Sequence, residues 1–250
     1  MSEFTVLGVR VNAIQIPGVV ETLRQWIRDR GPARFVAVTG MHGVMEARQS
    51  PEFRRVLADA DLVVPDGMPL VWMGRFHGLD LRRRVYGPEL METFLRETKD
   101  AYRHFFYGGA EGVADQLAAV LQEKFGIQVA GTWCPPFRPL SAAEESEVVT
   151  RIEESKADVV WIGLSTPKQE RWMHAHRNLK VPVMIGVGAA FDFHTGRAVQ
   201  APRWMRENGL EWLFRLLSEP RRLWRRYIIL GSKFGWNVTL QLLGWRDFSS

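Results

Sequence analysis

Short apolar runs alternate along the chain with longer stretches in which apolar and polar residues are mixed. The runs are rich in β-branched and aromatic residues and too short for helices, so we predict that each is a buried strand. These strands are expected at residues 4–9, 34–39, 62–64, 104–107, 127–131, 159–162 and 183–187. The mixed stretches have the spacing of helices with one buried face. Helices are expected at residues 19–30, 45–57, 88–98, 113–124, 144–154 and 167–176.

The order of these elements predicts the class of fold. Strands that alternate with helices of ten or more residues indicate βαβ units and a mostly parallel sheet flanked by helices. The composition then changes near Ala201. Seven arginines and three glutamates lie between Arg203 and Arg226, and five of the ten tryptophans lie in the last 47 residues. We therefore predict an α/β domain at residues 1–200 and a basic, tryptophan-rich helical appendage at residues 201–250.

The net charge of the chain limits the kinds of partner that it is expected to bind. A formal charge of +5 favours an anionic partner, which means a phosphorylated ligand, a nucleic acid or a membrane surface. The single cysteine, Cys134, excludes an internal disulfide and fits a reducing compartment. The longest apolar run, residues 181–191, is shorter than the roughly 20 residues that a membrane-spanning helix needs. Since the first residues also lack a signal-peptide pattern, we expect a soluble or peripheral protein.

Polar or glycine-rich turns follow five of the predicted strands. The turns hold Thr39 and His42; Asp66 and Gly67; Gly108 and Gly109; Ser165, Lys168 and Gln169; and Gly188, with Asp192 close behind it. The carboxyl ends of parallel strands meet at one edge of a sheet, and ligands of open α/β folds bind there. The sequence therefore predicts that these side chains face one crevice.

The turn after residues 159–162 has the clearest local pattern. Thr166 is predicted to cap a helix, with Pro167 as its first residue and Gln169 as the third position of a capping box. The free N–H groups of the new helix would favour an anion. The alternative is a well-capped helix after a buried strand, with no ligand.

Three further positions have residue types suited to chemistry. Asp66 ends a strand beside Gly67 and is the best general-base candidate, with the cap of the next helix as its alternative role. Gly108 and Gly109 open a turn whose N–H groups could cradle a phosphate, or that simply joins a strand to a helix. Arg84 could bind a phosphate through two hydrogen bonds, or belong to a solvated basic run.

Other enzyme classes fit the sequence less well. Asp59 and Asp61 have the spacing of a metal-binding D-x-D motif, but they precede their strand and so belong to the opposite edge of the sheet. We therefore predict no metal and no cofactor. Ser165 follows a strand as the nucleophile of a serine hydrolase does, but Pro167 replaces the final glycine of that motif. A half-match to a dinucleotide fingerprint has Phe191 where a glycine is required.

Five ordered motifs give a more specific signal. They are LVVPDG at residues 62–67, RVYGP at 84–88, GLSTPKQE at 163–170, GVGAAFD at 186–192, and GLEWLFR followed by EPRR at 209–222. Together they resemble the WecG/TagA/CpsF family of glycosyltransferases, and the match runs from about residue 6 to residue 226. The resemblance implies a Rossmann-like domain with a C-terminal appendage.

The resemblance also implies an activity. Such enzymes move a sugar from a nucleotide-sugar, usually a UDP-sugar of the ManNAc, ManNAcA or glucose type, to a sugar linked to polyprenyl diphosphate. They invert the anomeric centre, need no metal, and serve surface polysaccharide, teichoic acid or exopolysaccharide assembly. By the family pattern Asp66 is the base, Arg84 assists the diphosphate, and Thr39 and Gln169 lie in the donor site. Appendage arginines would close over the leaving group: Arg215, Arg222 and Arg225.

A membrane-bound acceptor would explain the composition of the appendage. Arginine is attracted to anionic headgroups and tryptophan prefers the membrane interface, so we expect a cytoplasmic protein, peripheral on the inner face of the plasma membrane. The alternative is that the tryptophans pack the appendage onto the core. Arginines with interleaved aromatic residues also suit a phosphate backbone, so a nucleic-acid-binding module is the non-enzyme alternative. Homo-oligomerisation is left open.

Overall fold

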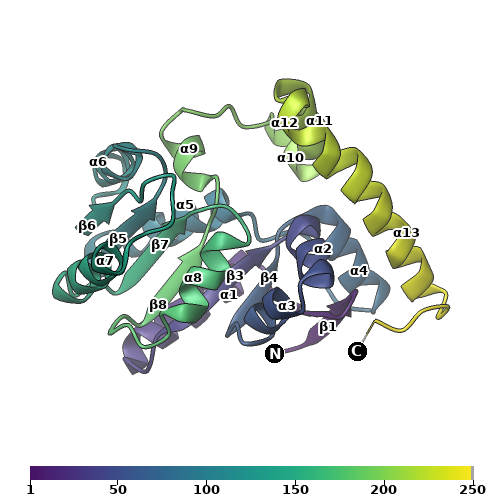
Figure 1. Cartoon of the computed structure of the whole chain (residues 1–250), viewed down its shortest axis with the longest axis horizontal. Coiled ribbons are helices and arrows are strands. Elements are labelled where there is room, and N and C mark those ends of the chain that lie inside the picture. The colour runs from purple at the N-terminus through teal and green to yellow at the C-terminus, as the bar shows by residue number, and fades with distance from the viewer. Residues whose placement is uncertain (249–250) are drawn as a thin grey trace.

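The computed structural model describes residues 1–248, apart from the side chain of Arg222. Its centre is a sheet of six parallel strands in the order β4-β3-β8-β7-β5-β6 (Figure 1). The strands are β3 (Arg34–Thr39), β4 (Leu62–Pro65), β5 (Arg103–Gly108), β6 (Gln128–Trp133), β7 (Val159–Gly163) and β8 (Val183–Gly186). The predicted α/β class with a Rossmann-like parallel sheet is confirmed.

The N-terminal strand prediction is wrong in one respect. Residues 4–9 do not form one strand but belong to an antiparallel hairpin of β1 (Glu3–Val6) and β2 (Val9–Asn12), outside the main sheet. Leu7 and Gly8 make the two-residue turn with positive φ angles of 49° and 84°. The Asn12 side chain accepts a hydrogen bond of 2.8 Å from the Val63 N–H, which ties the hairpin to β4.

Helices cover both faces of the sheet because alternate strand residues point to opposite sides. Val36 and Val38 of β3 face one core, whereas Phe35 and Ala37 face the other. The first core lies under α1 (Ile16–Asp29), α5 (Gly87–Thr98), α6 (Val113–Phe125) and α9 (Ala190–His194). The second lies under α2 (Met41–Gln49), α3 (Pro51–Ala58), α4 (Met68–Phe76), α7 (Ala142–Glu154) and α8 (Lys168–Ala175).

One helix prediction needs correction, and one helix was missed. The helix expected at residues 45–57 is divided at Ser50, because Pro51 disfavours the helical conformation of the residue before it. Ser50 instead caps α3, and its hydroxyl accepts a hydrogen bond of 3.2 Å from the Phe53 N–H. Helix α4 was not predicted, and a short 3-10 turn (Lys99–Ala101) follows α5.

The predicted appendage is a series of consecutive helices that packs against the sheet domain (Figure 1). It comprises α10 (Arg203–Glu207), α11 (Glu211–Ser218), α12 (Pro220–Trp224), a π-helical segment (Arg225–Leu230) and α13 (Gly231–Leu242). The Gln241 side chain fastens its far end to the hairpin. It donates to the Thr5 carbonyl and accepts from the Leu7 N–H, both at 2.8 Å. The placing of a domain boundary at residue 200 stays a prediction.

The tryptophans of the appendage do not pack it onto the core. Trp204, Trp212, Trp224, Trp236 and Trp245 are all between 42% and 73% exposed. The appendage is instead packed onto the core by Phe234 and Phe248, which are buried, and by the partly buried Leu230, Val238 and Leu240. Within residues 1–248, none of the helices has both the length and the apolar character required to cross a bilayer.

Candidate active site

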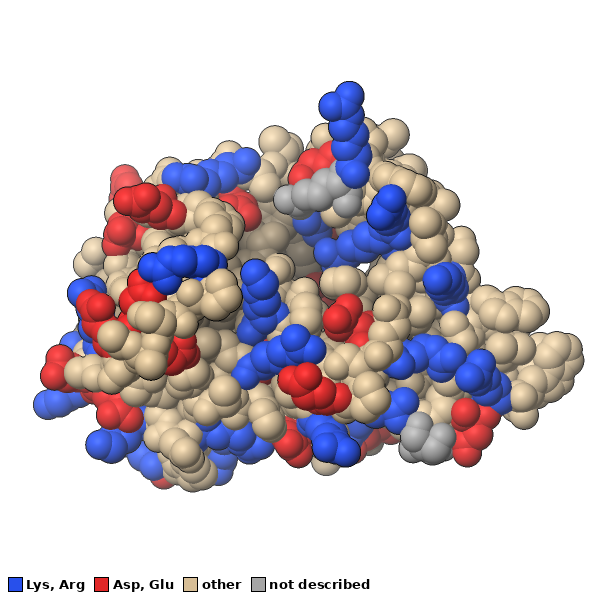
Figure 2. Space-filling model, in the orientation of Figure 1, with Lys and Arg blue, Asp and Glu red and all other residues tan. Residues whose placement is uncertain are grey.

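A cleft of about 760 Å³ lies at the carboxyl edge of the sheet, between the ends of four strands and the appendage. A hollow is visible there in the space-filling view, with basic side chains beside it (Figure 2). The strand ends contribute His42, Asp66, Gly67, Ser165, Gln169 and Gly188, and α9 contributes Asp192. The appendage contributes Glu211, Arg215 and Arg226. Four of the five predicted turns thus meet in one cleft.

The remaining predicted turn, which follows β5 and holds Gly108 and Gly109, does not line the cleft. Gly108 has a φ of +134°, and a Cβ at this position would lie 2.6 Å from the carbonyl carbon of Gly163. The N–H of Gly109 donates a hydrogen bond of 3.1 Å to the Gly163 carbonyl. Gly108 therefore allows β5 and β7 to pack closely, while a Cβ at Gly109 would lie 2.7 Å from Cβ of Val113 in α6. The turn lies apart from the cleft, and the phosphate cradle stays a prediction.

Asp66 lies where β4 ends, held by the neighbouring strand. Its N–H donates a hydrogen bond of 2.8 Å to the Thr39 carbonyl. Its own carbonyl oxygen would be 2.3 Å from a Cβ at Gly40, so only glycine fits there. Thr39 is buried and supports Asp66 through the backbone rather than lining the cleft. Helix α4 is capped by Gly67 without a side-chain hydrogen bond, so the alternative role of Asp66 as a helix cap is wrong.

The carboxylate of Asp66 is in an unusual environment for an acid. Its Oδ1 atom is inaccessible to solvent and has no hydrogen-bond partner in the described part of the chain. The nearest cationic atom is Nη1 of Arg84, at 3.7 Å. Burial raises the pKa of Asp66 to about 6, although Arg84 acts to lower it. Such a group is mostly ionised at neutral pH yet basic enough to accept a proton from a substrate.

Arg84 belongs to a buried cluster and not to a solvated basic run. Its side chain is only 15% exposed, compared with 67% for Arg83. It donates through Nη2 to Oε2 of Glu211, and its guanidinium carbon lies 4.1 Å from the centre of the Tyr86 ring. Burial acts to lower the pKa of Arg84, but the carboxylates of Asp66 and Glu211 outweigh it and raise the pKa above its usual value.

Glu211 is a site residue to which sequence reasoning assigned no role. It begins α11 of the appendage and is 6% exposed. Besides Arg84, its carboxylate accepts a hydrogen bond of 3.1 Å from the Tyr86 hydroxyl through Oε1. Its position in the GLEWLFR motif, among arginines, was the available signal.

The predicted capping box after β7 is not formed. Helix α8 begins at Lys168, after a cis peptide bond between Thr166 and Pro167, and has no side-chain cap. The Thr166 hydroxyl donates a hydrogen bond of 2.9 Å to Oε1 of Glu170, instead of accepting a hydrogen bond from an N–H of the helix backbone. Lys168 does not line the cleft. The turn is therefore organised around the buried Glu170, whose pKa is raised by that burial.

Gln169 joins two of the strand ends that line the cleft. Its Oε1 accepts a hydrogen bond of 3.0 Å from the Gly188 N–H, and its Nε2 donates 3.0 Å to Oε1 of Glu170. These bonds fix the turn after β7 against the turn after β8. Gln169, which is only 2% exposed, therefore holds in place two of the turns that form the wall of the cleft.

His42 is a neutral polar group in the cleft. Burial, together with the charge of Arg226, lowers the pKa of its imidazole to about 4. A neutral imidazole can donate to or accept from a ligand through one ring nitrogen without adding charge. His42 is thus suited to contact an uncharged part of a ligand.

The appendage arginines divide between the cleft and the outer surface. Arg215 lines the cleft, and its guanidinium carbon lies 5.8 Å from the centre of the Phe193 ring. Arg225 does not line it and lies over Trp224 instead, whereas Arg226, which was not predicted, does line it. Neighbouring residues on a helix point in different directions, so only one of the two can face inward. The side chain of Arg222 lies outside the described part of the structure.

Comparison with known proteins agrees with this geometry. The model of the Glycosyl transferase WecG/TagA/CpsF family matches residues 4–247. The chain belongs to the WecG/TagA/CpsF family. It is also 31% identical, over 217 residues, to the N-acetylglucosaminyldiphosphoundecaprenol N-acetyl-beta-D-mannosaminyltransferase of Bacillus spizizenii (strain ATCC 23059 / NRRL B-14472 / W23). That match covers 86% of this chain and 82% of the relative. The resemblance seen in the motifs is confirmed, and the protein is a glycosyltransferase.

The D-x-D pair lies away from the cleft of this glycosyltransferase. Asp61 accepts a hydrogen bond of 3.0 Å from the Phe35 N–H at the start of β3 and pairs with Arg177 at 3.3 Å. Asp59 pairs with His174 at 2.9 Å. Among the described residues, no three His, Cys, Asp or Glu side chains are grouped so that they could hold a metal ion.

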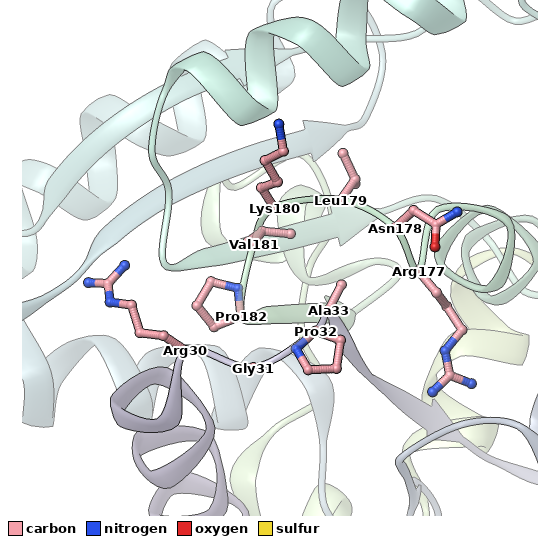
Figure 3. Close-up of a pocket in the computed structure, with 10 residues that line it drawn as sticks. All are labelled: Arg30, Gly31, Pro32, Ala33, Arg177, Asn178, Leu179, Lys180, Val181 and Pro182. Carbon is pink, nitrogen blue, oxygen red and sulfur yellow. The ribbon is translucent and has the colours of Figure 1, made fainter.

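A second cavity, of about 450 Å³, lies at the amino ends of β3 and β8, on the edge of the WecG/TagA/CpsF domain opposite the cleft (Figure 3). Three basic side chains line it, but each is paired with an acid. Arg30 pairs with Asp158 at 3.1 Å, and Lys180 pairs with Glu153 at 3.7 Å, while Arg177 has its partner Asp61. This cavity shares no residue with the cleft.

Proposed function

We propose that this glycosyltransferase moves a sugar, with inversion, from a UDP-sugar of the ManNAc, ManNAcA or glucose type to a sugar linked to polyprenyl diphosphate. The name of the Bacillus relative, which describes transfer of N-acetylmannosamine to an N-acetylglucosamine on diphosphoundecaprenol, supports the type of sugar and the class of acceptor. The product would enter surface polysaccharide, teichoic acid or exopolysaccharide assembly. The observation that carries the proposal is Asp66, a carboxylate with a raised pKa in a cleft lined by arginines.

Asp66 is the proposed base. It accepts the proton of the acceptor hydroxyl as the hydroxyl oxygen bonds to the anomeric carbon of the donor. The bond from that carbon to the phosphate oxygen breaks at the same time, and the nucleoside diphosphate leaves with the electron pair. A single displacement of this kind inverts the anomeric centre. It requires one basic carboxylate rather than the pair used in retaining glycosidases.

Arginines are the proposed stabilisers of the leaving diphosphate. Arg215 and Arg226 reach the cleft from the appendage, opposite the strand ends that carry Asp66. Cationic groups placed where negative charge develops lower the barrier without a divalent ion. Arg84 adds positive charge beside Asp66. The appendage would thus complete the donor site when it docks.

The appendage is also the proposed membrane contact. Its five exposed tryptophans and its arginines have the composition of an interfacial surface, as a lipid-linked acceptor requires. We propose that the enzyme binds peripherally to the cytoplasmic face of the plasma membrane through this surface.

A two-stage experiment tests the proposed function. A thermal-shift screen with a panel of nucleotide-sugars should show stabilisation by one UDP-sugar, because a ligand that binds only the folded state raises its melting temperature. That donor is then incubated with a synthetic polyprenyl-diphosphate-linked N-acetylglucosamine, and the product is weighed by mass spectrometry and its anomeric configuration assigned by NMR. Absence of transfer with every donor, or a retained configuration, would reject the proposal.

A further inference from the structure

Glu211 is an acid in a cleft that has to accept a diphosphate. A free carboxylate there would repel the ligand, so its presence requires an explanation. Both of its oxygens are already engaged: Oε2 accepts from Arg84 and Oε1 accepts from the Tyr86 hydroxyl at 3.1 Å. Its side chain is 8% exposed. Glu211 therefore acts on its protein neighbours rather than on a ligand.

The neighbour that matters most is Arg84, which lies between two carboxylates. Its Nη2 is bonded to Glu211, while its Nη1 is 3.7 Å from Oδ1 of Asp66. That separation is longer than the roughly 2.7–3.2 Å of a hydrogen bond. The Tyr86 ring, 4.1 Å from the guanidinium carbon, supports the same orientation. As long as Glu211 holds Arg84, the Oδ1 atom of Asp66 stays without a hydrogen bond.

We propose that Glu211 is a positioning residue for the transfer reaction: it holds Arg84 back from Asp66, so that the base receives no direct hydrogen bond from this arginine. The proposal follows from the two contacts of Arg84, which bonds Glu211 through Nη2 while its Nη1 stays 3.7 Å from Asp66. The inference rests on the proposed function, in which Asp66 is the base.

Removal of the Glu211 charge has a predictable sign. The charged groups that face Asp66 are Arg84, Glu211, Arg215 and Arg226, and the neutral Tyr86 and His42 complete its polar surroundings. Burial raises the pKa of Asp66 and the charge of Glu211 raises it further, whereas the arginines lower it. Without the Glu211 charge the pKa of Asp66 falls. Arg84, once released, can move to Asp66 and bond it directly, which lowers the pKa again.

The principal experiment compares Glu211→Gln with Glu207→Gln. Glu207 is a matched control because it is an acid of the same appendage that pairs with Arg203 at 2.8 Å on the surface. The kcat and kcat/KM values of each variant are measured across pH. We expect E211Q to lose about 10²-fold in kcat, the typical effect of a misplaced catalytic group, and to shift the acidic limb of kcat/KM to lower pH. E207Q should match the wild type. An unchanged acidic limb in E211Q would overturn the proposal.

A double-mutant cycle tests whether Glu211 acts through Arg84. If it does, adding E211Q to Arg84→Lys costs much less than E211Q costs in the wild type, because the two changes disrupt one unit. Fully additive losses would contradict the proposal. If E211Q is misfolded by its melting curve, Glu211→Asp replaces it in the comparison. E211D keeps the charge and should keep the wild-type acidic limb, and a limb shifted to lower pH in this variant would count against the proposal.

A measurement without substrate separates this inference from the proposed function. The ¹³C chemical shift of the Asp66 carboxyl, assigned by comparison with Asp66→Asn, gives its pKa in the wild type and in E211Q. A lower pKa in E211Q supports the role of Glu211 even if no donor or acceptor is turned over, in which case only the proposed function fails. An equal pKa in the two proteins rejects the role of Glu211 even if the enzyme is active.

Discussion

Replacing Asp66 by asparagine should remove activity and stabilise the fold. As the proposed base, Asp66 supplies about 10²–10⁴-fold in rate, so kcat of D66N should fall by that factor while the donor affinity stays the same. Asparagine has nearly the same shape but no charge. The two effects together would distinguish a catalytic carboxylate from one that holds the structure together, because loss of a structural carboxylate lowers stability.

The size of the stability effect follows from the environment of Asp66. Burial raises its pKa from the ordinary value of 3.8 to about 6. The folded protein therefore binds this proton more tightly than the unfolded chain does. At about 1.4 kcal/mol per pKa unit, the ionised carboxylate costs the fold at most about 3 kcal/mol at neutral pH, and less because its side chain is 31% exposed and so partly screened by solvent. Since D66N also takes one carboxylate from Arg84, we expect a net gain of about 1–3 kcal/mol.

The pH dependence provides the control. The cost of ionising Asp66 is absent below about pH 4, grows as the pH rises through 6, and is complete above it. Urea unfolding of wild type and D66N, measured at pH 7 and again near pH 4.5, should show an advantage for D66N that shrinks at the lower pH. The reasoning is refuted if D66N is less stable than the wild type at pH 7, or if it keeps its turnover.

Three further outcomes are expected. Arg215→Ala should lower kcat by about 10²–10³-fold, because it removes a group that stabilises charge in the transition state. Arg225→Ala should leave kcat unchanged when it is measured in detergent. Equal losses in the two variants would contradict the division of the appendage arginines between the cleft and the outer surface. Activity should survive excess EDTA because guanidinium groups serve the leaving diphosphate; complete loss restored by magnesium or manganese would count against this. Replacing the exposed Trp236 and Trp245 by alanine should weaken sedimentation with anionic vesicles at low salt while the melting temperature stays the same; unchanged sedimentation would remove the membrane role from this surface.

The sheet could be predicted because its strands, apart from the partly exposed β6, are buried on both faces. Burial of this kind gives apolar runs such as residues 159–162, and the turns between such runs mark the carboxyl edge. Residues 4–9 misled the same reasoning. Leu7, in the hairpin turn, is fully buried and so continues the apolar run, and the turn lacks the asparagine or aspartate that often marks one.

The parts of the site that were missed depend on distant contacts or on helix rotation. Glu211 bonds Arg84 across 127 positions of sequence, and no local pattern reports which acid such an arginine will meet. The exchange of Arg225 for Arg226 reflects the rotation of the π-helical segment on which both lie. A sequence pattern finds basic residues in that segment, but the packing of the helix decides which one faces the cleft.

If Arg226 stabilises the leaving diphosphate as proposed, the hydrogen bonds of Gln241 to the N-terminal hairpin make a remote segment part of the catalytic geometry. From Arg226 to Gln241 the helical axis runs roughly 20 Å at 1.5 Å per residue, so a tilt of about 5° at the hairpin end would displace Arg226 by about 2 Å. Misplacement of a catalytic group by about 1 Å can cost 10²-fold in rate. The contacts of Gln241 with Thr5 and Leu7 therefore set the tilt of the helix and, with it, the position of Arg226. Substitutions in the first ten residues would then be read as active-site lesions in an activity screen, although they touch no substrate.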